Sequence, residues 1–127
     1  MIQGIEPSLT MRIAQRSLDA CVLRQEALAS NIANAETPGF KRMDVAKDFA
    51  DRLKTAVQRG GTKGALPAPR LAEDSHARAQ RADGNTVDLE NELLQMNKNQ
   101  VDHEYLTNLI GSNFKTLKMA ITGRSSF

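Results

Sequence analysis

The sequence predicts an all-α protein, in which long N- and C-terminal helices pair as an antiparallel coiled coil around a short irregular middle region. Apolar residues recur at alternating steps of three and four near both ends of the chain. The middle is interrupted by glycines and prolines, and aromatic residues make up only 4% of the 127 residues. A core built from Leu, Met and Ala in place of large rings favours helices, because these residues are good helix formers.

The first predicted helix runs from about Ser8 to Ala35. Its seam carries small or apolar side chains and one glutamine: Met11, Ala14, Leu18, Cys21, Gln25, Leu28, Ile32 and Ala35. This is the heptad spacing of a helix that packs along another helix. Ser8 is the expected N-cap, because its hydroxyl can accept a hydrogen bond from a free N–H of the first turn.

The segment Thr37-Pro38-Gly39-Phe40 is expected to end this helix. Proline disfavours helical geometry at the preceding Thr37, and it lacks the N–H group that would continue the helix. Gly39 can adopt a positive φ without steric cost. The sequence therefore predicts a type II turn with Pro38 at its second position.

Residues 37–82 are predicted to hold this turn, a short helix and a flexible loop. The short helix follows from the amphipathic spacing of Val45, Phe49, Leu53, Ala56 and Val57, and it is expected to end at Gly60-Gly61. A strand near residues 40–44 is the alternative for the start of this region. From residue 59 to residue 81, the apolar residues show no sustained period, which is typical of a loop.

The second long helix is expected from Thr86 to about Thr122, after the turn signal Asp83-Gly84-Asn85. Asn85 is the predicted N-cap, and the carboxylate of Asp88 favours the positive end of the helix dipole. The predicted seam is Leu89, Leu93, Met96, Gln100, His103, Thr107, Ile110, Phe114, Leu117 and Ile121. Leu94, Val101 and Tyr105 widen it into a broader apolar face.

These elements divide the chain into one structural unit of three segments, residues 1–36, 37–82 and 83–127. Two paired helices form a thin core for a chain of this length. Either the middle helix completes a bundle, or the paired helices finish burying their apolar faces against neighbouring molecules. The polar seam residues Gln25, Gln100, His103 and Thr107 favour the second interpretation, because polar seam groups weaken a pair but help to select its partner.

The composition argues against several other classes of protein. The net charge is only +2, from 17 basic and 15 acidic residues, whereas nucleic-acid binding needs concentrated positive charge. The single cysteine excludes an internal disulfide framework. The first seven residues do not look like a secretory signal, and no apolar run reaches the ~18 residues of a membrane span.

No catalytic, cofactor-binding or metal site is expected. His103 stands between Asp102 and Glu104, but adjacent residues on a helix point in different directions. His76 has no acidic residue at ligand spacing, and Cys21 is expected to be a small buried thiol. The sequence contains no phosphate-binding loop, metal-site or nucleophile motif.

Two segments carry a family resemblance. Residues 29–41, Ala-Ser-Asn-Ile-Ala-Asn-Ala-Glu-Thr-Pro-Gly-Phe-Lys, resemble the N-terminal signature of bacterial flagellar rod and hook proteins. Residues 83–90, Asp-Gly-Asn-Thr-Val-Asp-Leu-Glu, are similar to the start of the C-terminal helix in the proximal rod subset of that family. Two departures are Glu36, where the family more often has Asp or Asn, and Phe40, where it often has Tyr.

The resemblance implies a structural subunit of the proximal rod, the drive shaft that links the membrane ring to the hook and serves motility. Its implied partners are itself, other rod proteins, the adaptor proteins between membrane ring and rod, and the flagellar type III export apparatus. Nucleic acid, small-molecule substrates and cofactors are not implied. The implied location is the periplasmic rod of the basal body, reached without a cleaved signal peptide. A cytoplasmic helical adaptor or a nucleic-acid-binding protein is the alternative.

The resemblance and the seams together indicate two sets of functional residues. The residues expected at the assembly interface are Leu18, Leu28, Ile32, Leu89, Leu93, Met96, Ile110, Phe114, Leu117 and Ile121. The residues expected to direct the chain out of the first helix are Asn31, Asn34, Thr37, Pro38, Gly39 and Phe40.

Overall fold

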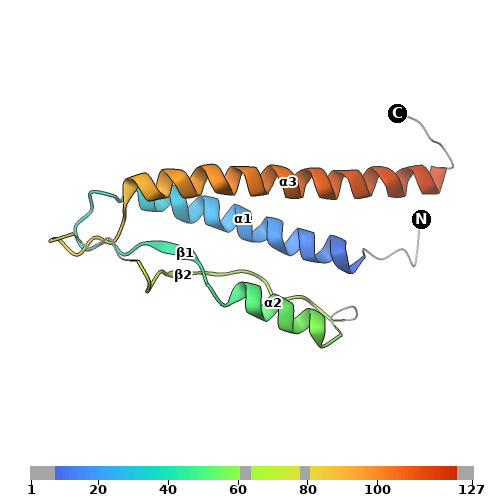
Figure 1. Ribbon diagram of the computed structural model, residues 1–127, viewed down its shortest axis with the longest axis horizontal. Coiled ribbons are helices and arrows are strands. Elements are labelled where there is room, and N and C mark those ends of the chain that lie inside the picture. The colour runs from blue at the N-terminus through green and yellow to red at the C-terminus, as the bar shows by residue number, and fades with distance from the viewer. Residues whose placement is uncertain (1–7, 61–63, 78–80, 123–127) are drawn as a thin grey trace.

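The computed structural model describes residues 8–60, 64–77 and 81–122. Its elements, in order, are α1 (Leu9–Ala33), β1 (Met43–Val45), α2 (Phe49–Gln58), β2 (Leu71–Glu73) and α3 (Leu89–Thr122). The two long helices lie side by side and antiparallel along the long axis of the molecule (Figure 1). The two strands and α2 lie on the other side of α1, which is therefore the central element (Figure 1).

Both ends of α1 confirm the local predictions. The hydroxyl of Ser8 accepts a hydrogen bond from the Met11 N–H at 3.1 Å, so Ser8 is the N-cap. After the helix, the Phe40 N–H donates to the Thr37 carbonyl at 3.2 Å, and Gly39 has a φ of 74°. This hydrogen bond and the positive φ are the features that a type II turn requires.

Two sides of α1 are buried. The predicted seam residues Met11, Ala14, Cys21, Leu28 and Ala35 are all buried. On another side, Ala20 packs in an apolar core formed with residues of the middle region: Val45, Phe49, Leu53 and Leu66. The sequence pattern did not reveal this second side, because small residues such as Ala20 and Ala27 give only a weak apolar signal.

The middle region is more ordered than predicted. The short helix is confirmed as α2 from Phe49 onward, but Val45, which was assigned to it, lies in β1. The alternative strand near residues 40–44 is present as β1, shifted to residues 43–45. The expectation of an irregular loop for residues 59–81 is wrong in part, because β2 forms there and pairs antiparallel with β1. Strands of three residues are too short to show a period of two, and their pairing depends on a partner distant in the sequence.

The start of α3 also differs from the prediction. The helix begins at Leu89, and Asp88 takes the capping position, because its carboxylate accepts from the Asn91 N–H at 3.4 Å. Asn85 is not the N-cap. Its side chain is completely buried and is bonded to the end of α1.

The predicted coiled-coil pairing of α1 and α3 is not confirmed. The residues of α3 that are fully buried at this contact are Glu92 and Asn99, whereas Leu89 and Leu93 of the predicted seam stay about half exposed. The side of α3 that meets α1 is thus rotated from the predicted one by about one residue, or ~100°. Within the described residues, no helix has the length and apolar character that crossing a membrane requires.

Candidate assembly surface

A buried asparagine joins three elements near the C-terminal end of α1. The side-chain amide of Asn31 donates to the Met43 carbonyl at 2.8 Å and to the Glu92 carboxylate at 3.2 Å. Its side-chain oxygen accepts from the Met43 N–H at 2.9 Å. Asn31 is completely buried, so these bonds form without competition from water. One side chain therefore fixes both β1 and α3 against α1.

Arg42 continues this polar cluster. Its guanidinium donates to the carboxylates of Glu92, Asp44 (3.0 Å) and Asp74 (2.9 Å). Burial alone would lower the pKa of Arg42, but the hydrogen bonds to Glu92 and Asp44 outweigh it and raise the pKa above its ordinary value. Arg42 thus remains charged although only 5% of its surface is exposed. Removing one partner of such a buried pair typically costs about 3–5 kcal/mol of stability.

Asn85 clamps the chain where it leaves α1. Its side-chain amide donates to the carbonyls of Asn34 (3.0 Å), Ala35 (3.2 Å) and Thr37 (2.8 Å). Its side-chain oxygen accepts from the Val87 N–H at 2.7 Å. Three carbonyls that follow the end of α1 are therefore bonded by a residue about fifty positions further along the chain.

Residues 40–42 and 84–86, on either side of the Asn85 contacts, are hydrogen-bonded to each other. The Thr86 N–H donates to the Phe40 carbonyl at 3.0 Å, and the Arg42 N–H donates to the Thr86 hydroxyl at 2.8 Å. Lys41 reaches the Gly84 carbonyl at 2.7 Å. The two sequence signatures, residues 29–41 and 83–90, are therefore two halves of one structural unit. Asn31 and Asn34 of the first signature and Asn85 of the second were the sequence signal for it, since pairing between distant segments leaves no local pattern.

The predicted turn residues occupy this unit in different ways. Asn34 is the C-cap of α1, and its side chain bonds the Ser30 carbonyl at 2.9 Å and the Thr37 hydroxyl at 3.1 Å. Pro38 and Gly39 are exposed at the tip of the molecule, and Phe40 is half-buried. Asn85 therefore bonds the start of the turn at the Thr37 carbonyl, and Pro38 and Gly39 are exposed to solvent.

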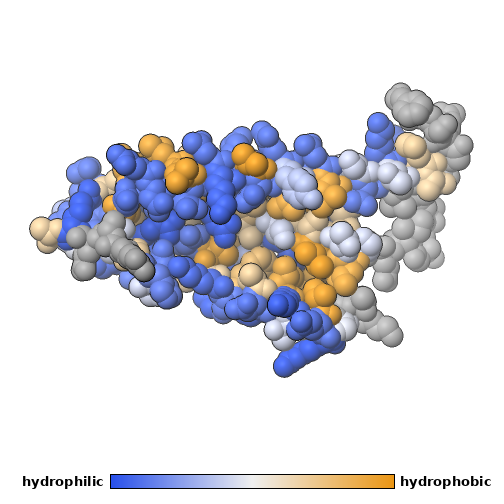
Figure 2. All heavy atoms as spheres, in the orientation of Figure 1, coloured by the Kyte–Doolittle hydropathy of each residue, from blue (hydrophilic) through white to orange (hydrophobic). Residues whose placement is uncertain are grey.

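Several large apolar side chains are exposed on α3. Leu94, Val101 and Tyr105, which follow one another at steps of seven and four, are each about two-thirds exposed. Leu89, Leu93 and Phe114 are about half exposed. Figure 2 shows apolar side chains standing among hydrophilic ones along α3, and a larger apolar area between α3 and α2. Helix α3 therefore buries polar Glu92 and Asn99 within the subunit and leaves apolar residues outside, the reverse of an ordinary surface helix.

The residues predicted at the assembly interface divide into four groups. Leu89, Leu93 and Phe114 are exposed, and Leu18, Ile32, Met96 and Ile110 are partly exposed. Leu28 has no exposed surface, so we assign it to the interior of the subunit instead of the assembly surface. The side chains of Leu117 and Ile121 lie outside the part of the chain that the structure describes.

The residues with chemically reactive side chains are dispersed. His103 is exposed on α3. His76 is exposed after β2, where its backbone N–H donates to the Asp74 carboxylate at 3.0 Å. Burial, and then the charge of Asp102, raise the pKa of the Cys21 thiol. Among the described residues, no three His, Cys, Asp or Glu side chains are grouped as metal ligands.

Comparison with known proteins points to one family. Residues 11–41 match the sequence model of the flagella basal body rod protein family. The flagellar basal body rod protein FlgB of Salmonella typhimurium is 32% identical to this chain, over 89% of this chain and 93% of its own length. The FlgB proteins of Escherichia coli (32% identical, 83% and 87% covered) and Borrelia hermsii (30%, 89% and 96%) are similar to the same extent.

Proposed function

Because this chain belongs to the FlgB family of flagellar basal body rod proteins, we propose that it is a subunit of the proximal rod. It assembles there with its own copies and with other axial proteins into the drive shaft between the membrane ring and the hook. The chain is a structural protein and not an enzyme. The observation that carries the proposal is the outward-facing apolar surface of α3, which a protein acting alone would have no reason to expose.

The assembly surface lies on α3 and on the partly exposed edge of α1. From the predicted set it includes Leu18, Ile32, Leu89, Leu93, Met96, Ile110 and Phe114, and it extends to Leu94, Val101 and Tyr105. Burying the rest of a half-exposed leucine contributes about 1 kcal/mol. Several such residues in one interface offset the side-chain entropy that ordering them costs. Helices of neighbouring subunits would pack against the apolar residues that α3 leaves exposed.

The further partners and the route to the rod follow from family membership. The chain would pass through the flagellar type III export apparatus without a cleaved signal peptide, and it would occupy the periplasmic part of the basal body. The adaptor proteins between membrane ring and rod would be its neighbours at one end. The similarity to FlgB proteins supports this location, and nothing favours the alternative of a cytoplasmic adaptor or a nucleic-acid-binding protein.

Purification of basal bodies tests the proposed function. The gene is deleted and replaced by a tagged copy, and intact basal bodies are isolated. We expect the deletion to abolish swimming, and the tagged chain to restore it and to co-purify with the basal bodies. A deletion strain that swims normally, or a tagged chain that restores swimming but stays in the cytoplasmic fraction, would contradict the proposal.

A further inference from the structure

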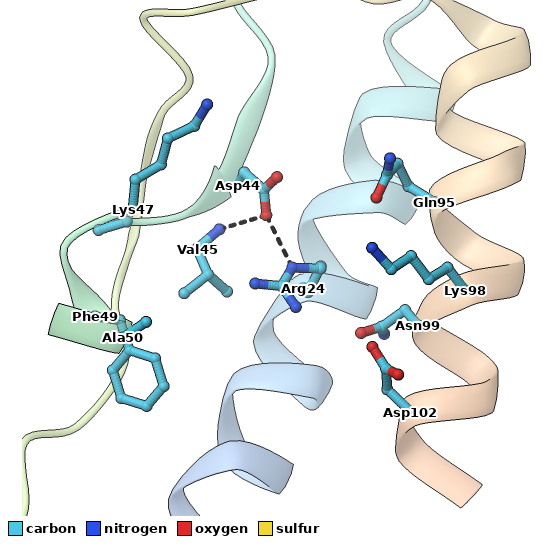
Figure 3. A pocket seen from close by; sticks show the side chains of 11 residues that line it. Arg24, Asp44, Val45, Lys47, Phe49, Ala50, Gln95, Lys98, Asn99 and Asp102 are labelled. Carbon is cyan, nitrogen blue, oxygen red and sulfur yellow. Dashed lines mark hydrogen bonds and ion pairs between the residues drawn. The ribbon is translucent and has the colours of Figure 1, made fainter. Parts of the chain in front are cut away.

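A cleft of about 360 Å³ lies between α3 and the segment that joins β1 to α2, with α1 at its base. Figure 3 shows Gln95, Lys98, Asn99 and Asp102 along its α3 side, and Val45, Lys47, Phe49 and Ala50 along the opposite side. Arg24 of α1 lies between the two sides (Figure 3). One side of the cleft is therefore polar, and the other contains apolar side chains.

Asn99 leaves a buried hydrogen-bond acceptor unused in this cleft. Its amide nitrogen donates to the Cys21 carbonyl at 2.9 Å and to the Gln25 side-chain oxygen at 3.3 Å. Both of these partners are acceptors, so the amide must point its nitrogen toward α1. The Asn99 oxygen then has no hydrogen-bond partner among the residues that the structure describes, although only 3% of Asn99 is exposed. A buried acceptor of this kind costs about 1–3 kcal/mol until a donor reaches it.

The charges around Asn99 leave one carboxylate available. Arg24 is paired with Asp44 at 3.2 Å, and Lys47 is paired with Asp74 at 3.4 Å. Asp102 lies beside Asn99, and no ion pair joins it to another of the described residues (Figure 3). The one further cation in the lining, Lys98, is exposed and has a long stem that can carry its amine into water. The cleft thus suits a partner that brings a cationic donor next to an apolar group.

The C-terminal end of α3 carries such a pair of groups. Phe114 is 56% exposed, and Lys115 next to it is also exposed. The contact of Asn99 with Cys21 sets the antiparallel register, in which the start of α1 at Leu9 comes opposite residue ~111 of α3. The end of α3 therefore extends past the start of α1 (Figure 1). Phe114 and Lys115 thus lie beyond the start of α1 along the axis of the helix pair.

We propose that the cleft of one subunit receives the C-terminal end of α3 from a second copy of this chain. The Lys115 amine bonds the Asn99 oxygen and the Asp102 carboxylate, and Phe114 packs toward Val45 and Phe49. This inference rests on the proposed function and names a contact within it. Lys115 cannot reach the cleft of its own chain, because sixteen residues of helix place it about 24 Å away. The contact is therefore made between two copies of the chain.

Charge reversal in the purified full-length chain tests this contact. Self-association is measured by sedimentation velocity over a range of concentrations. We expect Lys115→Glu and Asp102→Lys each to weaken self-association about tenfold or more, which is the loss of one charge-assisted hydrogen bond. The double variant Lys115→Glu/Asp102→Lys should recover most of it, because the pair is restored with its charges exchanged. Lys54→Glu, the same change at an exposed position of α2, should leave association unchanged.

The outcomes separate this contact from the proposed function. Wild-type chains that stay monomeric at every concentration, or single variants that associate like the wild type, would overturn the contact. Failure of the double variant to recover would also overturn it, because a merely structural role of Asp102 cannot be rescued by Lys115→Glu. The proposed function is judged separately, by recovery of the wild-type chain in basal bodies.

Discussion

Three buried asparagines connect segments that are distant in the sequence. Asn31 bonds the backbone of β1, Asn85 bonds the end of α1, and Asn99 bonds the Cys21 carbonyl. A short amide can donate and accept at once, so it can satisfy backbone groups of another segment without a regular strand or helix there. In this small protein, the hydrogen bonds of these side chains hold together segments that a larger apolar core would otherwise hold together.

The clamp at Asn85 predicts a large effect from a small change. We expect Asn85→Ala to lower the free energy of unfolding by about 2–4 kcal/mol, because three carbonyls each lose one of their hydrogen bonds and the buried Val87 N–H loses its partner. Urea unfolding followed by circular dichroism measures it. Asn91→Ala, at an exposed position on α3, is the matched control and should change stability by less than about 0.5 kcal/mol. Equal effects of the two substitutions would show that the clamp does not stabilise the fold.

At the scale of elements, α3 is the helix that departs most from the ordinary pattern. It turns Glu92 and Asn99 toward the rest of the subunit, where Asn31, Arg42 and the Cys21 carbonyl bond them. Leu89 and Leu93 remain about half exposed, and Leu94 is 64% exposed. The polar contacts fix the register of α3 against α1, and the apolar residues are left for other molecules.

This division of roles predicts that two leucines respond differently to the same change. Leu93→Asp should change the free energy of unfolding of the isolated subunit by less than about 1 kcal/mol, since Leu93 is about half exposed, and it should abolish swimming. Leu28→Asp should prevent stable folding, because it places a charge at a completely buried position. Stability is measured by urea unfolding, and swimming in soft agar. Normal swimming with Leu93→Asp would remove that residue from the assembly surface.

Local signals explain which elements were predicted from the sequence. The bounds of α1, its Ser8 cap and the turn at Gly39 each depend on a few adjacent residues, and all were predicted. The role of Asn85 and the strand β2 depend on partners about 25 to 50 residues away, and both were missed. The side of α3 that meets α1 was mispredicted for a physical reason, because an apolar seam was assumed to face the intrachain partner. Here the predicted seam is turned to one side of the α1 contact and is left partly exposed.

At the scale of the whole molecule, the subunit has a thin core and leaves apolar side chains exposed. One central helix carries α3 on one side and the short β1–α2–β2 region on the other (Figure 1). A chain of 127 residues arranged in this way covers only part of its apolar surface by itself. Contacts with neighbouring subunits would cover the remainder, so folding and assembly stabilise each other by mass action.

Cysteine alkylation compares the free and the assembled subunit most directly. The chain with Leu93→Cys is treated with a thiol reagent, both as purified subunit and in isolated basal bodies. Cys21 is the internal control, because it is buried and its raised pKa keeps it protonated, and it should react slowly in both samples. The thiol at position 93 should react rapidly in the free subunit and at least tenfold more slowly in basal bodies. Equal rates in the two samples would contradict the account, because they would show that the outer face of α3 stays open to water in the rod.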